Sequence, residues 1–431
     1  MMVYRTAPLL AALLVLGGAS AAEPAQPYAD QPARAMVRRG GLPNVMAKLN
    51  AGEPVRIAYF GGSITAQAGW RVFSFEWFGQ QWPAAELTQI DATIGGTNSE
   101  HGVYRYQQDV LSKDPDLVFV EFAVNDGGGQ PNNIFRAMEG IVRQTWAQDP
   151  TIDLCFVYTF RTGYENQLRE GLNPPAASAH EMLAEWYGIP SVNVALPVVQ
   201  MAEAGELLYT PVEVDGQRQP VPEGVVLFSD DGVHPHPEGG HRVYMALLAE
   251  ALDAWRAGDA PGPHVLRDPF IADHWQAAKL VPLRAAMLGG EWRQLPTDGG
   301  LGGAFNSRLP EIWATNQPGA SLTFSFVGTT AKLYDLLGPD GGQVDITLDG
   351  QTRGPVARFD SYCTYWRLAN LELARDLEPV RHTVTITLRA DQPDRAIVTD
   401  RERDKPDFDP AKYDGTNLWV GSIMILGDVV E

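Results

Sequence analysis

Two apolar segments constrain the fold of this chain more than any other feature: 116–124, "DLVFVEFAV", and 153–160, "DLCFVYTF". Both are apolar almost throughout, and each is followed by a segment with helical spacing, at 134–146 and 176–187. A strand that is apolar on both faces is buried on both faces, as in parallel sheets covered by helices on each side. The first part of the chain is therefore predicted to be an α/β domain with a parallel sheet.

The rest of this part keeps the same alternation. Further strands are predicted at 55–60, 87–94 and 191–195, and further helices at 72–82, at 103–111 and from Pro237 to Trp255, where apolar residues form one stripe. In open α/β sheets, ligands bind beyond the carboxyl ends of the strands. Polar residues that directly follow a strand are therefore the candidates for function.

The first candidate is Ser63, which ends the stretch "RIAYFGGSIT" at 56–65. An apolar strand stops at Gly61 and Gly62, and the serine follows at once. Gly-Gly-Ser is also ordinary turn chemistry, because glycine accepts unusual backbone angles and serine caps helices. A serine hydroxyl is a weak nucleophile that needs a base, so this assignment depends on the rest of the chain.

A candidate base lies in "DGVHP" at 231–235. His234 can take the proton of a serine, and Asp231, three residues earlier, can orient the imidazole and stabilise its charged form. Any Asp-Gly turn can also hold a nearby histidine. The tetrahedral intermediate of acyl transfer further needs hydrogen-bond donors. The backbone N–H of Ser63, a glycine of "IGGTNS" at 94–99 and Asn125 of "FAVND" are the candidates.

Together these four blocks resemble those of the SGNH hydrolases, also called GDSL-type esterases. The resemblance spans about 55–255 and implies a three-layer α/β/α, flavodoxin-like SGNH domain. It implies that Ser63 is the nucleophile, His234 the base and Asp231 its partner. It also implies that Gly96 and Asn125 form the oxyanion hole with the Ser63 amide.

This sequence departs from the family pattern at three points. The usual Gly-Asp-Ser-Leu reads Gly-Gly-Ser-Ile here, and Ala123 replaces the usual glycine before Asn-Asp. The doubled glycine leaves Gly95 as an alternative to Gly96. None of these departures removes a group that performs chemistry.

A linker is predicted at 257–263, "AGDAPGP", where the α/β pattern breaks. Beyond it, short alternating strands punctuated by glycine predict a β-sandwich. The domains are therefore a signal peptide at 1–22, an SGNH hydrolase domain at 31–257 and a β-sandwich accessory domain at 264–431. The last resembles the jelly-roll-like modules of some carbohydrate esterases. Its Tyr362, Tyr365 and Trp366 could stack on a sugar, but core or interdomain packing is the favoured interpretation.

The N-terminus indicates export. Arg5 precedes an apolar stretch at 7–16, and Ala19-Ser20-Ala21 has the form of a cleavage site. The apolar stretch is too short to cross a bilayer, so we expect a periplasmic or extracellular protein without stable membrane insertion. A net charge of -20 argues against nucleic acid and anionic membranes as partners.

Neither a metal nor a cofactor is expected, since the chain has no CxxC, no HExxH and no helical histidine pair. Cys155 and Cys363 are predicted to be buried free thiols. Glu121 lies within an apolar strand and shares a face with Asn125. A buried carboxylate needs a partner, and either Arg71 or Arg105 could supply it.

These patterns predict a secreted serine esterase that hydrolyses O-acyl esters, foremost O-acetyl esters of a carbohydrate, through an acyl-enzyme. One alternative is a lipase or lysophospholipase, for which 205–224 could cover the site. Another is an inactive carbohydrate-binding protein. We expect the second domain to contribute to substrate fit rather than chemistry. The sugar, the oligomeric state and the acyl chain length stay open.

Overall fold

The computed structural model describes residues 23–431, so the predicted signal peptide at 1–22 lies outside the described residues. Its first sheet has six strands in the order β1-β6-β5-β4-β2-β3. They are β1 (Met36–Val37), β2 (Val55–Gly61), β3 (Leu87–Asp91), β4 (Leu117–Glu121), β5 (Asp153–Tyr158) and β6 (Ser191–Asn193). All pairs are parallel except β1 with β6. Without β1 the order is that of flavodoxin-like folds, which confirms the predicted fold class.

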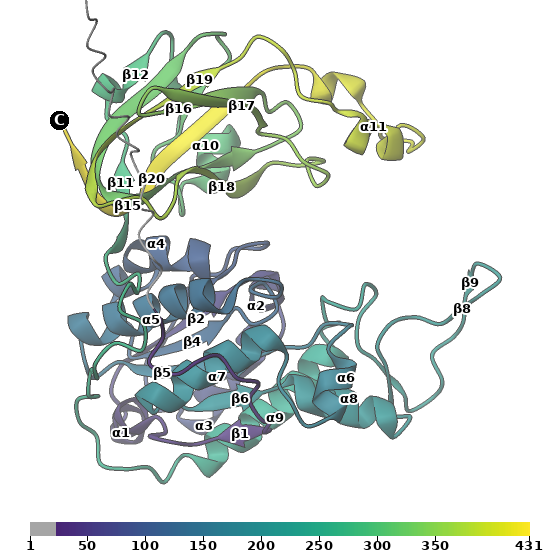
Figure 1. The fold of residues 1–431 in the computed structure, drawn as a ribbon. Coiled ribbons are helices and arrows are strands. Elements are labelled where there is room, and N and C mark those ends of the chain that lie inside the picture. Colours follow the sequence, from purple (N-terminus) through teal and green to yellow (C-terminus); the bar gives the residue numbers. More distant parts are fainter. Residues whose placement is uncertain (1–22) are drawn as a thin grey trace, which may run out of the picture.

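Helices cover both faces of this sheet (Figure 1). On one face lie α4 (Ser99–Asp109), α5 (Pro131–Gln148) and α7 (Pro175–Tyr187), and on the other α1 (Pro43–Ala51), α3 (Trp70–Gln81), α8 (Ala195–Glu203) and α9 (Gly240–Ala254). The strands serve both layers alternately: Ala58 and Phe60 pack into the first core, and Ile57 and Tyr59 into the second. The apolar strands are thus buried on both faces, as predicted.

The second domain is built from antiparallel strands that form one ten-stranded network. Its strands are β11 (Ala278–Pro282), β12 (Leu288–Gly289), β13 (Arg293–Gln294), β14 (Trp313–Thr315), β15 (Ser321–Leu337), β16 (Gln343–Leu348), β17 (Gln351–Ala357), β18 (Arg367–Ala374), β19 (Val380–Leu388) and β20 (Leu418–Val430), with short helices α10 (Gly300–Phe305) and α11 (Ala396–Glu402). The long strand β15 pairs with β19 through its first half and with β18 through its second, and with β20 along most of its length. The predicted all-β domain is confirmed.

The two domains share one buried core. Tyr104 of α4 belongs to the same apolar cluster as Tyr334 of β15 and Met424 of β20. Beside this cluster, Glu100 forms ion pairs with Lys332 and Arg375 of the β domain. Helix α4 is therefore covered by the sheet on one side and by the β domain on the other (Figure 1).

The segment between the domains packs against the first domain. The ring of His264 stacks on Trp146 at 4.9 Å, and its Nε2 lies 2.8 Å from Asp153 Oδ1. The predicted linker therefore leads into a chain segment that is anchored on the α/β domain.

The insertion at 205–224 projects from the α/β domain. Its strands β8 (Glu213–Val214) and β9 (Gln217–Arg218) pair with each other and point away from the body of the molecule (Figure 1). At its base, β7 (Leu207–Leu208) pairs with β10 (Val226–Leu227). Among the described residues, no helix is long and apolar enough to cross a membrane. Cys155 and Cys363 are both buried and free, as predicted.

Candidate active site

Ser63 is the first residue of α2 (Ser63–Ala66), which starts directly after β2. Both glycines before it are required by close packing. A Cβ at Gly62 would lie 2.0 Å from Asn125 Oδ1, and one at Gly61 would lie 2.8 Å from Thr65 Oγ1. A Cβ atom does not approach a non-bonded atom this closely, so a side chain at either position would displace the turn or Asn125. The doubled glycine lets the serine and the asparagine meet.

His234 and Asp231 meet this serine from the loop before α9. The distance from His234 Nε2 to Ser63 Oγ is 2.8 Å, and from His234 Nδ1 to Asp231 Oδ2 it is 2.7 Å. The second carboxylate oxygen of Asp231 accepts the backbone N–H groups of Val233 at 2.9 Å and His234 at 2.8 Å. This is the arrangement in which an imidazole can take a serine proton while a carboxylate holds its tautomer.

The hydrogen bonds to Asp231 keep it ionised. Partial burial by itself would raise its pKa, but bonds from the His234 ring and from the backbone amides of His234 and Val233 outweigh burial and lower the pKa to about 2. The carboxylate is therefore charged at neutral pH, and this negative charge lies directly beside the His234 ring.

The predicted oxyanion donors surround the same serine. Gly95, Gly96 and Asn125 line one cleft with Ser63. Gly96 has φ +72°, a left-handed conformation that favours glycine. A Cβ at Gly95 would lie 3.5 Å from that of Ser63, so this residue lies directly against the nucleophile. Both glycines therefore line the cleft beside the nucleophile, and both stay candidate donors.

Glu121 lies fully buried at the end of β4, beneath this turn. Its carboxylate accepts Thr65 Oγ1 at 2.7 Å and Thr159 Oγ1 at 2.8 Å. Burial raises its pKa to about 7, against hydrogen bonds from both threonines and the Gly62 amide. The prediction that an arginine pairs with Glu121 is wrong, because Arg71 pairs with Asp91 and Arg105 pairs with Asp109. The hydrogen bonds to the Glu121 carboxyl come from neutral threonine hydroxyl groups and not from a cation.

The residue after Asn125 ties this loop to helix α4. Asp126 Oδ1 accepts the backbone N–H of Ser99 at 2.9 Å and its hydroxyl at 3.0 Å, and Asp126 Oδ2 lies 2.7 Å from His180 Nε2. All three side chains are buried. The Asn-Asp pair thus has divided roles: the first residue faces the cleft and the second anchors the loop.

The cleft, of about 930 Å³, lies between the two domains. The α/β domain supplies the residues described above, and the β domain supplies an opposite wall that includes Phe305, Arg308, Tyr362, Tyr365 and Trp366. Tyr362 and Tyr365 are 68% and 56% exposed. The favoured prediction of core or interdomain packing for Tyr362, Tyr365 and Trp366 is therefore wrong for the two tyrosines. Their segment is a turn that leaves the rings facing the cleft.

The residues that line the cleft test two further predictions, one about the insertion at 205–224 and one about Trp366. Among the described residues, none of 205–224 lines it, so this insertion does not cover the site as expected for a lipase lid. Trp366, in contrast to the tyrosines, is partly buried: its Nε1 donates to Asp340 Oδ1 at 3.1 Å and its ring meets Trp419 edge-on. It lines the cleft beside the tyrosines while these contacts hold its ring in place.

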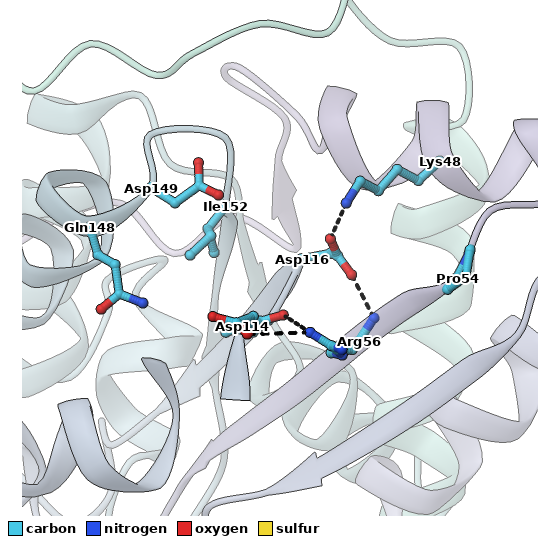
Figure 2. A pocket seen from close by; sticks show the side chains of 9 residues that line it. Lys48, Pro54, Arg56, Asp114, Asp116, Gln148, Asp149 and Ile152 are labelled. Atoms are coloured by element: carbon cyan, nitrogen blue, oxygen red, sulfur yellow. Dashed lines mark hydrogen bonds and ion pairs between the residues drawn. The ribbon is translucent and has the colours of Figure 1, made fainter. Parts of the chain in front are cut away.

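A second hollow, of about 310 Å³, lies at the amino ends of β2, β4 and β5, the opposite edge of the sheet. Figure 2 shows Lys48 and Arg56 reaching Asp116 and Asp114 in this hollow. Lys48 is paired with Asp116 and Arg56 with Asp114, and none of the residues that line this hollow is a serine or a histidine. It is therefore not a candidate for ester chemistry. Within residues 23–431, no group of three or more potential metal ligands gathers.

Comparison with known proteins finds similarity over the region that holds this site. Residues 59–242 match the model of the GDSL-like lipase/acylhydrolase family. A two-domain esterase active on acetylated mannans, co-crystallised with mannopentaose, is similar in structure, with a TM-score of 0.70 and 20% identity over 94% of this chain and 100% of that chain. A second structure of such an esterase has the same TM-score and identity over 92% and 98%. The similarity therefore extends over both domains. No curated protein matches the sequence significantly.

Proposed function

We propose that this carboxylic ester hydrolase, whose residues 59–242 match the model of the GDSL-like lipase/acylhydrolase family, is an exported serine esterase that removes O-acetyl groups from a carbohydrate. One observation carries this proposal. The hydrogen-bonded series Ser63–His234–Asp231 opens into a cleft whose far wall presents exposed tyrosines. A polar, aromatic wall suits a sugar, because rings of this kind stack on pyranose faces.

The geometry supports a two-step mechanism. His234 Nε2 takes the proton of Ser63 Oγ as this oxygen attacks the acetyl carbonyl. The amide of Ser63, a glycine amide of 95–96 and the Asn125 side chain stabilise the oxyanion. The intermediate collapses as the bond from the acetyl carbon to the sugar oxygen breaks. The protonated His234 gives its proton to this oxygen, which leaves as a hydroxyl, and the acetyl group stays on Ser63. A water activated by His234 then releases acetate.

The cleft favours a short acyl group over a long one. No residue of the projecting insertion lines it, so the described chain supplies no cover for a long alkyl chain. The similar two-domain structure is of an esterase active on acetylated mannans, which makes acetylated manno-oligosaccharides the first substrates to try. Export rests on the N-terminal sequence at 1–22.

The test is a screen of acetylated manno- and xylo-oligosaccharides that measures acetate release, with p-nitrophenyl acetate and octanoate alongside. We expect acetate release from at least one oligosaccharide and preference for the acetyl over the octanoyl ester. The matched control is Ser63→Ala, which should lower turnover by several orders of magnitude and lose labelling by a fluorophosphonate. Preference for octanoate would favour a lipase, and an unlabelled wild-type protein would favour a binding protein.

A further inference from the structure

Arg308 of the β domain reaches into the α/β domain beside the active site. Its Nη2 donates to the carbonyl of Asp91 at 2.8 Å and to that of Thr93 at 3.4 Å. Its Nε lies 3.9 Å from Asp109 Oδ2, and its own carbonyl accepts Gln108 Nε2 at 2.9 Å. Arg308 is therefore attached to the α/β domain through both its side chain and its backbone.

Arg308 donates hydrogen bonds to the loop at 91–96, which carries the candidate oxyanion-hole glycines Gly95 and Gly96. Within 91–94, each carbonyl has a side-chain donor: Arg308 for Asp91 and Thr93, Arg105 at 2.6 Å for Ala92, and Thr97 Oγ1 at 2.8 Å for Ile94. The amide of Ile94 donates to the Gly61 carbonyl at 3.1 Å. In the described chain, the amides of Gly95 and Gly96 have no such partner.

We propose that Arg308 is a positioning residue for catalysis, through which the β domain holds the loop at 91–96 so that its free glycine amides face the nucleophile. This inference rests on the proposed function only for its kinetic consequence. It also revises the expectation that the β domain contributes to substrate fit alone, since one of its side chains supports the chemical step.

The physical reason is preorganisation. In a trans peptide the C=O of one residue and the N–H of the next point in opposite directions. The bonds from Arg308 to the carbonyls of Asp91 and Thr93 therefore fix the amides of Ala92 and Ile94, and the bond from Thr97 to the Ile94 carbonyl fixes the amide of Gly95. Arg308 thus holds the segment that leads directly into the glycines. An oxyanion hole works because its donors are already aimed when charge develops, and a displacement of about 1 Å can cost on the order of 100-fold in rate. Gly96 has φ +72° and no neighbour within 4 Å of a Cβ position, so its own packing does not fix it, and its orientation depends on how the segment before it is held.

The experiment compares Arg308→Ala and Arg308→Lys with Arg375→Ala in the full chain. Arg375 is the matched control, because it also crosses between domains, to Glu100, but does not touch the loop. The substrate is p-nitrophenyl acetate, which is too small to need the β wall. We expect Arg308→Ala to lower kcat by about 10- to 100-fold with little change in KM, Arg308→Lys to lose less, and Arg375→Ala to stay close to wild type.

Two further measurements separate positioning from general loosening. Added guanidinium should restore part of the activity of Arg308→Ala and none in Arg375→Ala. Hydrogen exchange should accelerate at 91–98 in Arg308→Ala only, a readout that holds even if the protein is not an acetylesterase. Equal effects of the two alanine variants on kcat and exchange would overturn the proposal, as would an Arg308→Ala protein with wild-type kcat. If Arg308→Ala does not fold, Arg308→Lys decides by the same criteria.

Discussion

At the scale of single residues, the clearest consequence concerns Gly62. Its Cβ position is occupied by the amide of Asn125, so Gly62→Ala should displace this amide from the oxyanion hole. We expect kcat on p-nitrophenyl acetate to fall by about 100-fold or more, the usual effect of losing one oxyanion donor.

The control is Gly79→Ala in helix α3, where the nearest atom to a Cβ is a methyl of Leu87 at 3.9 Å. This change should leave kcat unchanged and raise stability slightly, because alanine favours a helix over glycine by roughly 0.5–1 kcal/mol. Similar losses of activity in both variants would contradict the role given to the Gly62–Asn125 contact.

Glu121 makes stability depend on pH. Burial raises its pKa in the folded protein to about 7 from the ordinary 4.5, so the folded state binds the proton more tightly than the unfolded one. The carboxyl therefore lowers the free energy of unfolding increasingly as pH rises from about 4.5 to 7, by up to about 3 kcal/mol. Glu121→Gln cannot ionise, so its stability relative to wild type should increase over this window.

Urea denaturation of both proteins at pH 5 and pH 8 measures this difference. We expect the free energy of unfolding of Glu121→Gln, relative to that of wild type, to be larger at pH 8 than at pH 5. The same stability difference at both values would show that Glu121 is equally protonated in the folded and unfolded states.

At the scale of elements, the turn before β18 lines the cleft with the aromatic wall that we propose contacts the sugar. Tyr365→Ala should lower kcat/KM on an acetylated oligosaccharide by up to about 10-fold, the free energy of one aromatic contact, and leave p-nitrophenyl acetate unaffected. Ile397→Ala in α11 is the control, since Ile397 is similarly exposed at 57% but does not line the cleft. The rate of acetate release at subsaturating substrate gives kcat/KM for both variants. An equal loss on the small ester would place Tyr365 in the chemical step.

At the scale of the whole molecule, the shared core couples the domains. Helix α4 packs in one apolar cluster with Tyr334 and Met424, and Glu100 is held by two β-domain cations. We expect calorimetry of the full chain to show a single cooperative unfolding transition, because neither domain can lose this interface without exposing apolar surface. Two well-separated transitions would show that the interface contributes little. A chain that ends near Gly258 would expose the same face of α4, and we expect it to be less soluble.

The sequence by itself determined what local patterns encode. Apolar runs such as 117–121 imply strands buried on both faces, and four short blocks carry Ser63, the glycines at 95–96, Asn125 and His234 because each chemical group needs a particular turn directly after a strand. Only the tertiary structure decided what faces these groups. Glu121 is satisfied by threonines rather than by an arginine, Tyr362 and Tyr365 face the cleft rather than the interior, and Arg308 grips a loop more than 200 residues earlier in the chain. These contacts join residues that lie far apart in the sequence. They depend on how distant segments and the two domains pack, and no local periodicity or motif spacing in the sequence encodes that packing.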